Sequence, residues 1–239
     1  MVTTPGTNAA RKFDADRAGE YAVQSRIALA GYDACHELAA CLLAADLEPG
    51  RSARILVVGA GGTGQEILTA ARLEPGWHFT AVDPSQPMLD LAMANIEKAG
   101  FSVRTTAFIG EVAGLSAEQV FDAATLIGVL HHLPGDAAKH AVLGMIAAHL
   151  PPSAPLILAG NRHAYASRPL FLAAWGERWR MHGATPQEIE TKLGKILQGA
   201  DPPTSDEHVS NLLVQAGFEV PTQFFSSLFW GGWLTRRAA

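Results

Sequence analysis

Four glycines follow an apolar run in ILVVGAGGTGQEI, residues 55–67. Glycine lets a backbone pass close to a ligand, and Gly59, Gly61 and Gly64 have the G-x-G-x-x-G spacing of a nucleotide-binding turn between a strand and a helix. Asp83 ends the next apolar run, about where an acidic side chain would accept hydrogen bonds from the two ribose hydroxyls of an adenosine. These residues predict a site for a ligand that contains adenosine.

Residues after the last glycine limit which ligand this is. Gln65 and Glu66 stand where a P-loop would have Lys and Ser or Thr, so a nucleoside triphosphate is excluded. Two ligands fit: a dinucleotide with its pyrophosphate on the helix N-terminus, or S-adenosylmethionine with its methionine part there. A tight turn without a ligand is the third interpretation, and it leaves four costly glycines unused.

Elements that position this loop alternate along the chain. Apolar runs predict strands at 54–58, 77–82, 103–109, 121–129 and 155–159, and helical spacing predicts helices at 30–47, 65–73, 87–99 and 137–150. This alternation predicts an α/β fold with a doubly wound parallel sheet that binds its ligand at the carboxyl ends of the central strands. The β-rich runs 223–229 and 230–236 are joined by a short connection around Gly231 and Gly232, so we expect an antiparallel pair at one edge.

Bulk properties narrow the class of protein. The 239 residues are 48% hydrophobic and carry a net charge of −5. They predict one domain and no nucleic-acid partner, because no basic stripe is present. The chain start lacks the apolar segment of a secretory signal and no run is long enough for a membrane span, so we expect a cytoplasmic protein. Cys35 and Cys41 lack ligand companions, which predicts reduced structural thiols and no metal site.

Three longer motifs resemble the class I S-adenosylmethionine-dependent methyltransferases: AVDPSQPMLDLAMANI (81–96), FDAATLIGVLHHLPG (121–135) and the terminal GFEVPTQFFSSLFWGGWLTRR. The resemblance implies a Rossmann-like sheet of seven strands with an antiparallel last strand. Segments 13–38 and 171–193 are similar to carboxy-S-adenosylmethionine synthase and its small-molecule methyltransferase relatives. They imply a helical cap at 1–50 and a methyltransferase domain at 51–239 that carries a helical insert at about 163–208. The cap and the insert would together enclose the substrate.

Two departures from these relatives matter. The synthase has an arginine on the helix before its equivalent of Ala216, and residues 206–215 contain none, so ordinary methyl transfer is preferred. At the position of Val57 the family usually has an acidic residue, and that acid takes part in recognition of the methionine amino group. Glu66 is a substitute for it, although an acid in a first helical turn is also favoured by the helix dipole alone.

The resemblance assigns roles residue by residue. The predicted cofactor-binding residues are Gly59, Ala60, Gly61, Gly64, Asp83, Pro84, Met88, Glu111, Val112 and Ile127. The predicted substrate-binding residues are Tyr21, Arg26, Tyr32, His132, Arg162, Trp175, Trp179 and Trp230. His131 is the predicted general base for a nucleophile that arrives protonated.

The expected function is methyl transfer from S-adenosylmethionine to an oxygen or nitrogen nucleophile of a small molecule. A carboxy-S-adenosylmethionine synthase-like enzyme, an NAD-dependent oxidoreductase and a non-catalytic cofactor-binding protein are the alternatives. The oligomeric state does not follow from the sequence, and a homodimer is left open.

Overall fold

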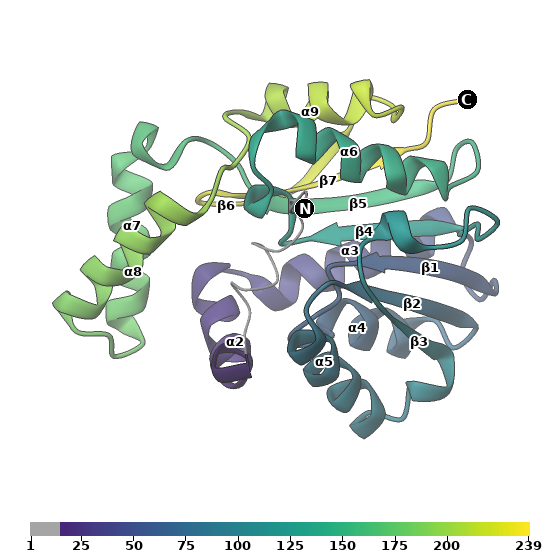
Figure 1. The fold of residues 1–239 in the computed structure, drawn as a ribbon, viewed down its shortest axis with the longest axis horizontal. Coiled ribbons are helices and arrows are strands. Elements are labelled where there is room, and N and C mark those ends of the chain that lie inside the picture. Colours follow the sequence, from purple (N-terminus) through teal and green to yellow (C-terminus); the bar gives the residue numbers. More distant parts are fainter. Residues whose placement is uncertain (1–14) are drawn as a thin grey trace, which may run out of the picture.

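A seven-stranded sheet forms the centre of the computed structural model, which describes residues 15–239, with side chains from residue 21 onward (Figure 1). The strands are β1 (Ala53–Val58), β2 (Trp77–Asp83), β3 (Thr105–Ile109), β4 (Ala123–Ile127), β5 (Pro155–Asn161), β6 (Thr222–Ser227) and β7 (Trp230–Arg236). Their order is β3-β2-β1-β4-β5-β7-β6. The first five are parallel, and β7 runs antiparallel to both β5 and β6. The predicted α/β class, the seven strands and the reversed last strand are confirmed.

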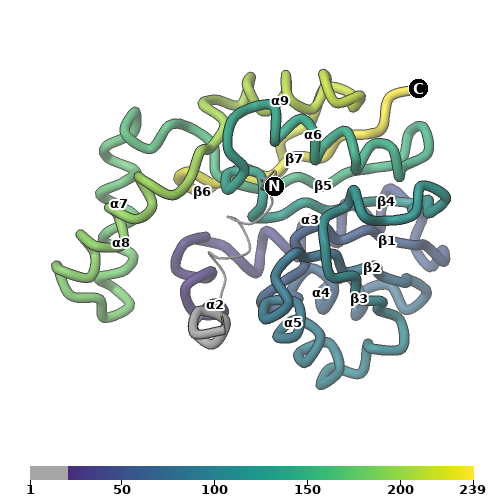
Figure 2. Tube along the Cα trace, viewed as in Figure 1, coloured from purple at the N-terminus to yellow at the C-terminus, as the bar shows by residue number. Residues whose placement is uncertain are grey.

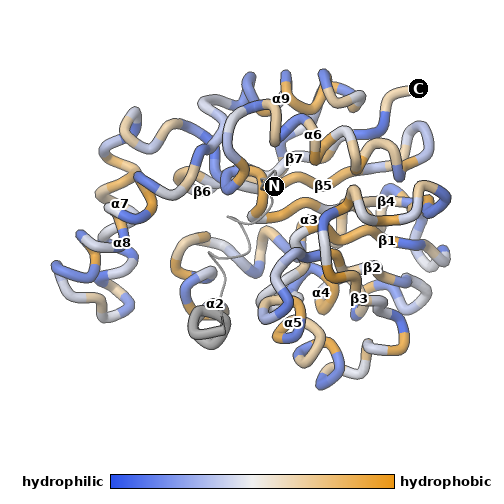
Figure 3. The backbone as a smooth tube through the Cα atoms, viewed as in Figure 1, coloured by the Kyte–Doolittle hydropathy of each residue, from blue (hydrophilic) through white to orange (hydrophobic). Residues whose placement is uncertain are grey.

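Central strands are apolar along their whole length because helices cover both faces of the sheet. Every residue of β4 and β5 is buried, and Figure 3 shows these strands as the most hydrophobic part of the fold. One face packs against α3 (Tyr32–Asp46), α4 (Gln65–Leu73) and α5 (Gln86–Lys98). The other face packs against α6 (Gly135–Ala148) and α9 (Asp206–Gln215). Short 3-10 helices η1 (Ser102–Arg104), η2 (Val112–Gly114), η3 (Leu130–His132) and η4 (Tyr165–Ser167) connect the elements.

Three helices extend from one end of the sheet, namely α2 (Ala15–Ala28), α7 (Pro169–Met181) and α8 (Pro186–Gly199) (Figure 1). The last carbonyls of α2 have no partner within their own helix, and side chains of α7 satisfy them. Trp175 Nε1 donates to Ala28 O at 2.8 Å, and Arg178 donates to Ile27 O at 2.9 Å and to Arg26 O at 3.0 Å. The end of α2 and the insert are therefore tied together.

The predicted 1–50 cap divides into two parts with different surroundings. The first fourteen residues lie outside the described part of the chain. Helix α2 belongs to the group at the end of the sheet, whereas α3 buries Cys35 and Leu43 in the main core. The insert is represented by α7 and α8, while α9 begins at Asp206 and packs on α6.

Several predicted boundaries differ from the structure. The expected helix 30–47 begins at Tyr32, residues 103 and 104 belong to η1 rather than to a strand, and β4 is shorter than 121–129. The predicted connection around Gly231 and Gly232 is wrong, because both residues lie inside β7 and the turn is at 228–229. A Cβ on Gly231 would lie 2.3 Å from the Trp233 ring and 2.4 Å from Arg162 Nη1. These glycines therefore serve close packing beside β5, where Figure 2 shows β7 running.

Within residues 15–239, no single helix is long and apolar enough to cross a membrane; residues 21–28 and 32–46 meet that test only as a pair, and the pair is bent by 83°.

Candidate functional site

A cavity of about 550 Å³ lies at the carboxyl ends of β1, β4 and β5. The glycine loop after β1 forms one wall, and η3, the end of β5 and the start of β7 form the opposite wall. Residues of α2, α3, α7 and α8 enclose it from outside the sheet. The position matches the one predicted from the alternation of strands and helices.

The glycine loop is fixed by hydrogen bonds from its own backbone. The N–H groups of residues 59–62 all donate to protein acceptors: two to Val82 O at 2.8 and 3.1 Å, one to Asp83 Oδ2 at 3.0 Å and one to Met88 O at 2.8 Å. The next helix begins with Gln65, whose N–H donates to Thr63 Oγ1 at 3.2 Å. Many of the loop N–H groups that would otherwise bind a pyrophosphate are therefore already hydrogen-bonded within the protein.

Asp83, the predicted ribose-binding residue, lies against the glycine loop. Its carboxylate accepts from the N–H of Gly61 at 3.0 Å and from the N–H of Ser85 at 2.8 Å. Burial raises the pKa of Asp83, and these two hydrogen bonds oppose that shift. A Cβ on Gly61 would lie 2.6 Å from Asp83 Oδ2 and 2.7 Å from Met88 Cβ. Only glycine therefore fits between β2, α5 and the cavity.

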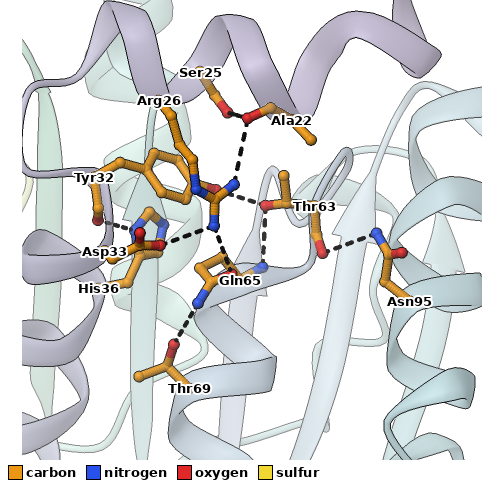
Figure 4. Close-up of polar contacts among 10 residues, drawn as sticks. All are labelled: Ala22, Ser25, Arg26, Tyr32, Asp33, His36, Thr63, Gln65, Thr69 and Asn95. Atoms are coloured by element: carbon orange, nitrogen blue, oxygen red, sulfur yellow. Dashed lines mark hydrogen bonds and ion pairs between the residues drawn. The ribbon is translucent and has the colours of Figure 1, made fainter.

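A network of polar contacts joins the outer helices to this loop (Figure 4). The Tyr32 hydroxyl hydrogen-bonds Thr63 Oγ1 at 2.6 Å. Arg26 lies over the Tyr32 ring, 4.6 Å from its centroid, and pairs with Asp33 at 2.8 Å and with Gln65 at 3.4 Å. Burial raises the pKa of Tyr32 to about 12, so its hydroxyl stays protonated at neutral pH. Arg26 thus belongs to this contact with the loop, outside the cavity.

Two further ionisable groups line the cavity: Glu66, which the sequence offered as a substitute for the acid missing at Val57, and His36, which sequence reasoning missed. Glu66 Oε1 accepts from Thr125 Oγ1 at 2.9 Å, and burial raises the pKa of Glu66 to about 8. His36 donates from Nδ1 to Tyr32 O at 2.7 Å, which leaves the lone pair on Nε2. Burial lowers the pKa of His36 below its ordinary value, so its ring is neutral at pH 7.

The wall opposite the glycine loop combines aromatic and polar side chains. The N–H of Asn161 donates to His131 Nδ1 at 3.3 Å, and Asn161 Nδ2 donates to the Tyr165 hydroxyl at 2.7 Å. The His131 ring meets that of Trp230 edge-on, with centroids 5.5 Å apart. Because Nδ1 accepts a hydrogen bond, the neutral imidazole carries its proton on Nε2 and donates there. This tautomer does not suit the predicted general base.

An ion pair between a buried lysine and an exposed aspartate holds the backbone of this wall. Lys139 is 1% exposed, and its Nζ donates to Asp201 Oδ2 at 2.9 Å, to Leu133 O at 2.9 Å and to Gly135 O at 3.2 Å. The N–H of Asp201 donates to His131 O at 2.8 Å. The segment after α8 is therefore fixed to the loop that carries His131.

The structure brings about half of the predicted site residues to the cavity. Gly59, Ala60, Gly61, Gly64, Ile127, His131, Tyr21, Tyr32, His132, Trp175 and Trp230 line it. Asp83, Pro84, Met88, Glu111 and Val112 do not, and they lie at and after the ends of β2 and β3. Glu111 and Pro84 are exposed, while Met88 and Val112 are buried in the fold.

Three predicted substrate residues lie elsewhere. Arg162 pairs with Asp206 at 3.0 Å and donates to Ser226 Oγ at 2.8 Å. Trp179 packs in the cluster around Phe229. Arg26 contacts the glycine loop from outside, as described above. None of the three contributes to the cavity wall.

Sequence reasoning missed several lining residues. They are Gln24, Ser25, His36, Thr63, Asn161, Tyr165 and Lys195. A signal existed for Asn161, a polar residue directly after an apolar strand, where parallel strands present ligand-binding side chains. Lys195 carries no local signal, because it is one of several charged residues on an amphipathic helix. Within residues 15–239, no cluster of metal-ligating side chains is found.

Comparisons with known proteins agree with this geometry. The family described as "Methyltransferase domain" matches residues 56–156, from β1 to the start of β5. No curated protein sequence matches the chain.

Solved structures of methyltransferases share the fold. An O-methyltransferase family 2 protein from Planctomyces limnophilus is 17% identical with a TM-score of 0.69, over 97% of this chain and 63% of its own. Mitomycin 7-O-methyltransferase is 19% identical with a TM-score of 0.60, over 84% and 54%. Human N-acetylserotonin methyltransferase is 17% identical with a TM-score of 0.55, over 78% and 48%. The chain therefore spans about half to two thirds of the length of these proteins.

The finer likeness to carboxy-S-adenosylmethionine synthase is not confirmed by these matches. The sheet order, the reversed last strand, the glycine loop and the matched domain confirm the broader resemblance: the chain has the fold of the class I S-adenosylmethionine-dependent methyltransferases.

Proposed function

We propose that the protein transfers a methyl group from S-adenosylmethionine to an oxygen or nitrogen atom of a small molecule. The carrying observation is the glycine loop, whose N–H groups at residues 59–62 are already donated to β2 and α5. A dinucleotide would place its pyrophosphate there, beside the Glu66 carboxyl group and with few free donors. S-adenosylmethionine carries no phosphate, and its positive charges suit a cavity wall that contains an acid.

Residues around the loop fit this cofactor. Gly61 brings the loop backbone against the half-buried Asp83 carboxylate, where a Cβ would clash, and this carboxylate is suited to ribose hydroxyls. When bound, S-adenosylmethionine supplies a methyl group activated by a positive sulfur. The chain's own part is alignment and exclusion of water, which suits an enclosed cavity between the sheet and the outer helices.

The opposite wall would hold the acceptor molecule. Trp230, Trp175 and Tyr165 offer aromatic surface, which suits a planar substrate. His131, with its proton on Nε2, would donate a hydrogen bond rather than remove a proton. An acceptor whose nucleophilic atom carries no proton that must be removed, such as a carboxylate oxygen, therefore fits better than one that needs a base. Two proteins of this fold support the assignment: the Planctomyces protein was solved with apigenin and the human enzyme with S-adenosylmethionine.

The test is binding followed by turnover. Calorimetric titration with S-adenosylhomocysteine, with NAD as the parallel ligand, should give micromolar binding of the former alone. Incubation with methyl-labelled S-adenosylmethionine and a panel of aromatic carboxylic acids, hydroxylated aromatic compounds and amines should then label at least one acceptor. Binding of NAD alone would overturn the proposal in favour of an oxidoreductase. Cofactor binding without label transfer to any acceptor would favour a non-catalytic cofactor-binding protein.

A further inference from the structure

Glu66 is the one carboxylate among residues 21–239 that lines the main cavity. It stands in the first turn of α4, and Thr125 on β4 holds one of its oxygens at 2.9 Å. Glu66 also lines a small apolar pocket beneath the cavity, together with Val57 and Ile127. Its carboxyl group therefore lies between the glycine loop and the floor of the cavity.

No positive partner accompanies this carboxyl group in the described part of the chain. Arg26 pairs with Asp33, and Lys195 is the sole lysine or arginine lining the cavity within residues 21–239, entering from α8. The titratable groups that face Glu66 from the neighbouring elements are Tyr21, Tyr32, Cys35, His36 and Asp83. A buried acid without a cation is costly in its charged form, and a cationic ligand group would supply the missing partner.

We propose that Glu66 binds the α-ammonium group of the methionine part of S-adenosylmethionine; this assignment rests on the proposed function. Its position in the cavity wall directly after the loop is where a ligand lying along that loop would bring a polar end group. The resembled family usually has its acid at the position of Val57 on β1, whereas here the acid, Glu66, comes from α4. Both residues line the same small pocket.

Binding then releases a proton. Burial raises the pKa of Glu66 to about 8, so near pH 7 the free protein holds a proton on this carboxyl group. An ammonium group favours the carboxylate, and the proton passes to the buffer as the ion pair forms. The free-protein groups around Glu66 do not titrate between pH 6.5 and 7.5: burial raises the pKa of Tyr21, raises those of Tyr32 and Cys35 to about 12, and lowers that of His36. Burial also raises the pKa of Asp83, and its two N–H donors oppose that shift.

The experiment measures proton release by calorimetry at pH 6.5 and 7.5 in two buffers of different ionisation enthalpy. The probes are S-adenosylhomocysteine, which has the ammonium group but no sulfonium, and 5′-methylthioadenosine, which lacks the amino acid part. Wild type should release close to one proton with S-adenosylhomocysteine and bind it up to about tenfold tighter at the higher pH. It should release none with 5′-methylthioadenosine.

Glu66→Gln keeps an acceptor for Thr125 and removes the titration. This variant should bind S-adenosylhomocysteine at least about tenfold more weakly, without proton release, and should bind 5′-methylthioadenosine like wild type. Glu97→Gln, at an exposed position on α5, is the matched control and should behave like wild type.

Each outcome decides one question. Absence of proton release by wild type overturns the role of Glu66 without any mutation, and so does unchanged binding by Glu66→Gln. Proton release with S-adenosylmethionine but not with S-adenosylhomocysteine would assign Glu66 to the sulfonium and overturn the ammonium assignment. If wild type binds neither probe, the proposed function itself fails.

Discussion

Replacing Lys139 with methionine tests how the cavity wall is held together. The lysine side chain is 1% exposed, and its ammonium group makes three hydrogen bonds, two to the carbonyls of Leu133 and Gly135 and one to Asp201. Methionine has a similar length and keeps the packing of the stem, so the loss is confined to polar interactions.

The expected loss follows from these contacts. The Leu133 carbonyl left without this donor costs about 1 kcal/mol, and the Gly135 carbonyl costs less because the helix N–H of residue 139 still reaches it. Asp201 is 58% exposed, so screening limits the ion pair to about 1 kcal/mol or less. We expect Lys139→Met to lower the free energy of unfolding by roughly 2 kcal/mol, and Asp201→Asn, which keeps an acceptor, by about 1 kcal/mol.

Urea unfolding followed by circular dichroism measures both variants, with Lys98→Met at an exposed position as the control. Lys139 lowers the pKa of Asp201, so the contribution of the ion pair is present above the ordinary aspartate pKa and is lost as the pH falls through the lowered one. The difference between wild type and Asp201→Asn should therefore shrink below about pH 4. A loss under about 0.5 kcal/mol for Lys139→Met, equal to that of the control, would refute this account.

Three further predictions concern other parts of the site. Gly61→Ala should abolish measurable S-adenosylhomocysteine binding because its Cβ overlaps the loop's neighbours, whereas Gly144→Ala, with open space around it, should leave binding intact; calorimetry compares the two. Trp175→Phe removes the hydrogen bond to Ala28 O, so the opening free energy of α2, measured by amide hydrogen exchange, should fall by about 1 kcal/mol. Unchanged exchange would contradict the role of this hydrogen bond in holding α2 to α7. Glu66→Gln should stabilise the ligand-free protein at pH 9 by up to about 5 kcal/mol, because the pKa of the wild-type carboxyl group is raised from 4.5 to about 8 and its charged form costs stability as the pH rises through that interval. At pH 4 the variant should gain nothing, and urea unfolding at both pH values decides this.

Local sequence patterns predicted most of the fold. Strands buried on both faces read as continuous apolar runs, and glycine spacing marked the loop after β1, so sheet and cavity position followed from short stretches of sequence. Gly231 and Gly232 misled this reasoning, because glycine signals a turn locally, whereas here it makes room for the Trp233 ring inside a strand.

Long-range pairings explain why some predicted site residues lie away from the cavity. Arg162 follows a strand, as a ligand-binding residue would, but Asp206 on α9 neutralises it across a separation that no local pattern reveals. Glu66 shows the reverse case. A first-turn acid usually faces water, and only the packing of α3 against α4 and β5 turns this one into part of the cavity wall.

The arrangement of the outer helices links the two ends of the cavity. Tyr32, just after α2, holds the glycine loop through Thr63, and the final carbonyls of α2 are held by Trp175 and Arg178 of the insert. Trp175 also lines the cavity, and its ring centroid lies 5.9 Å from that of Tyr165, whose hydroxyl accepts a hydrogen bond from Asn161. The connection from the glycine loop to Trp175 thus runs through one short stretch, residues 26–32. Under the proposed function, a cofactor that orders this stretch at the loop would also fix Trp175 for the acceptor, so the two ligands would be coupled through these contacts.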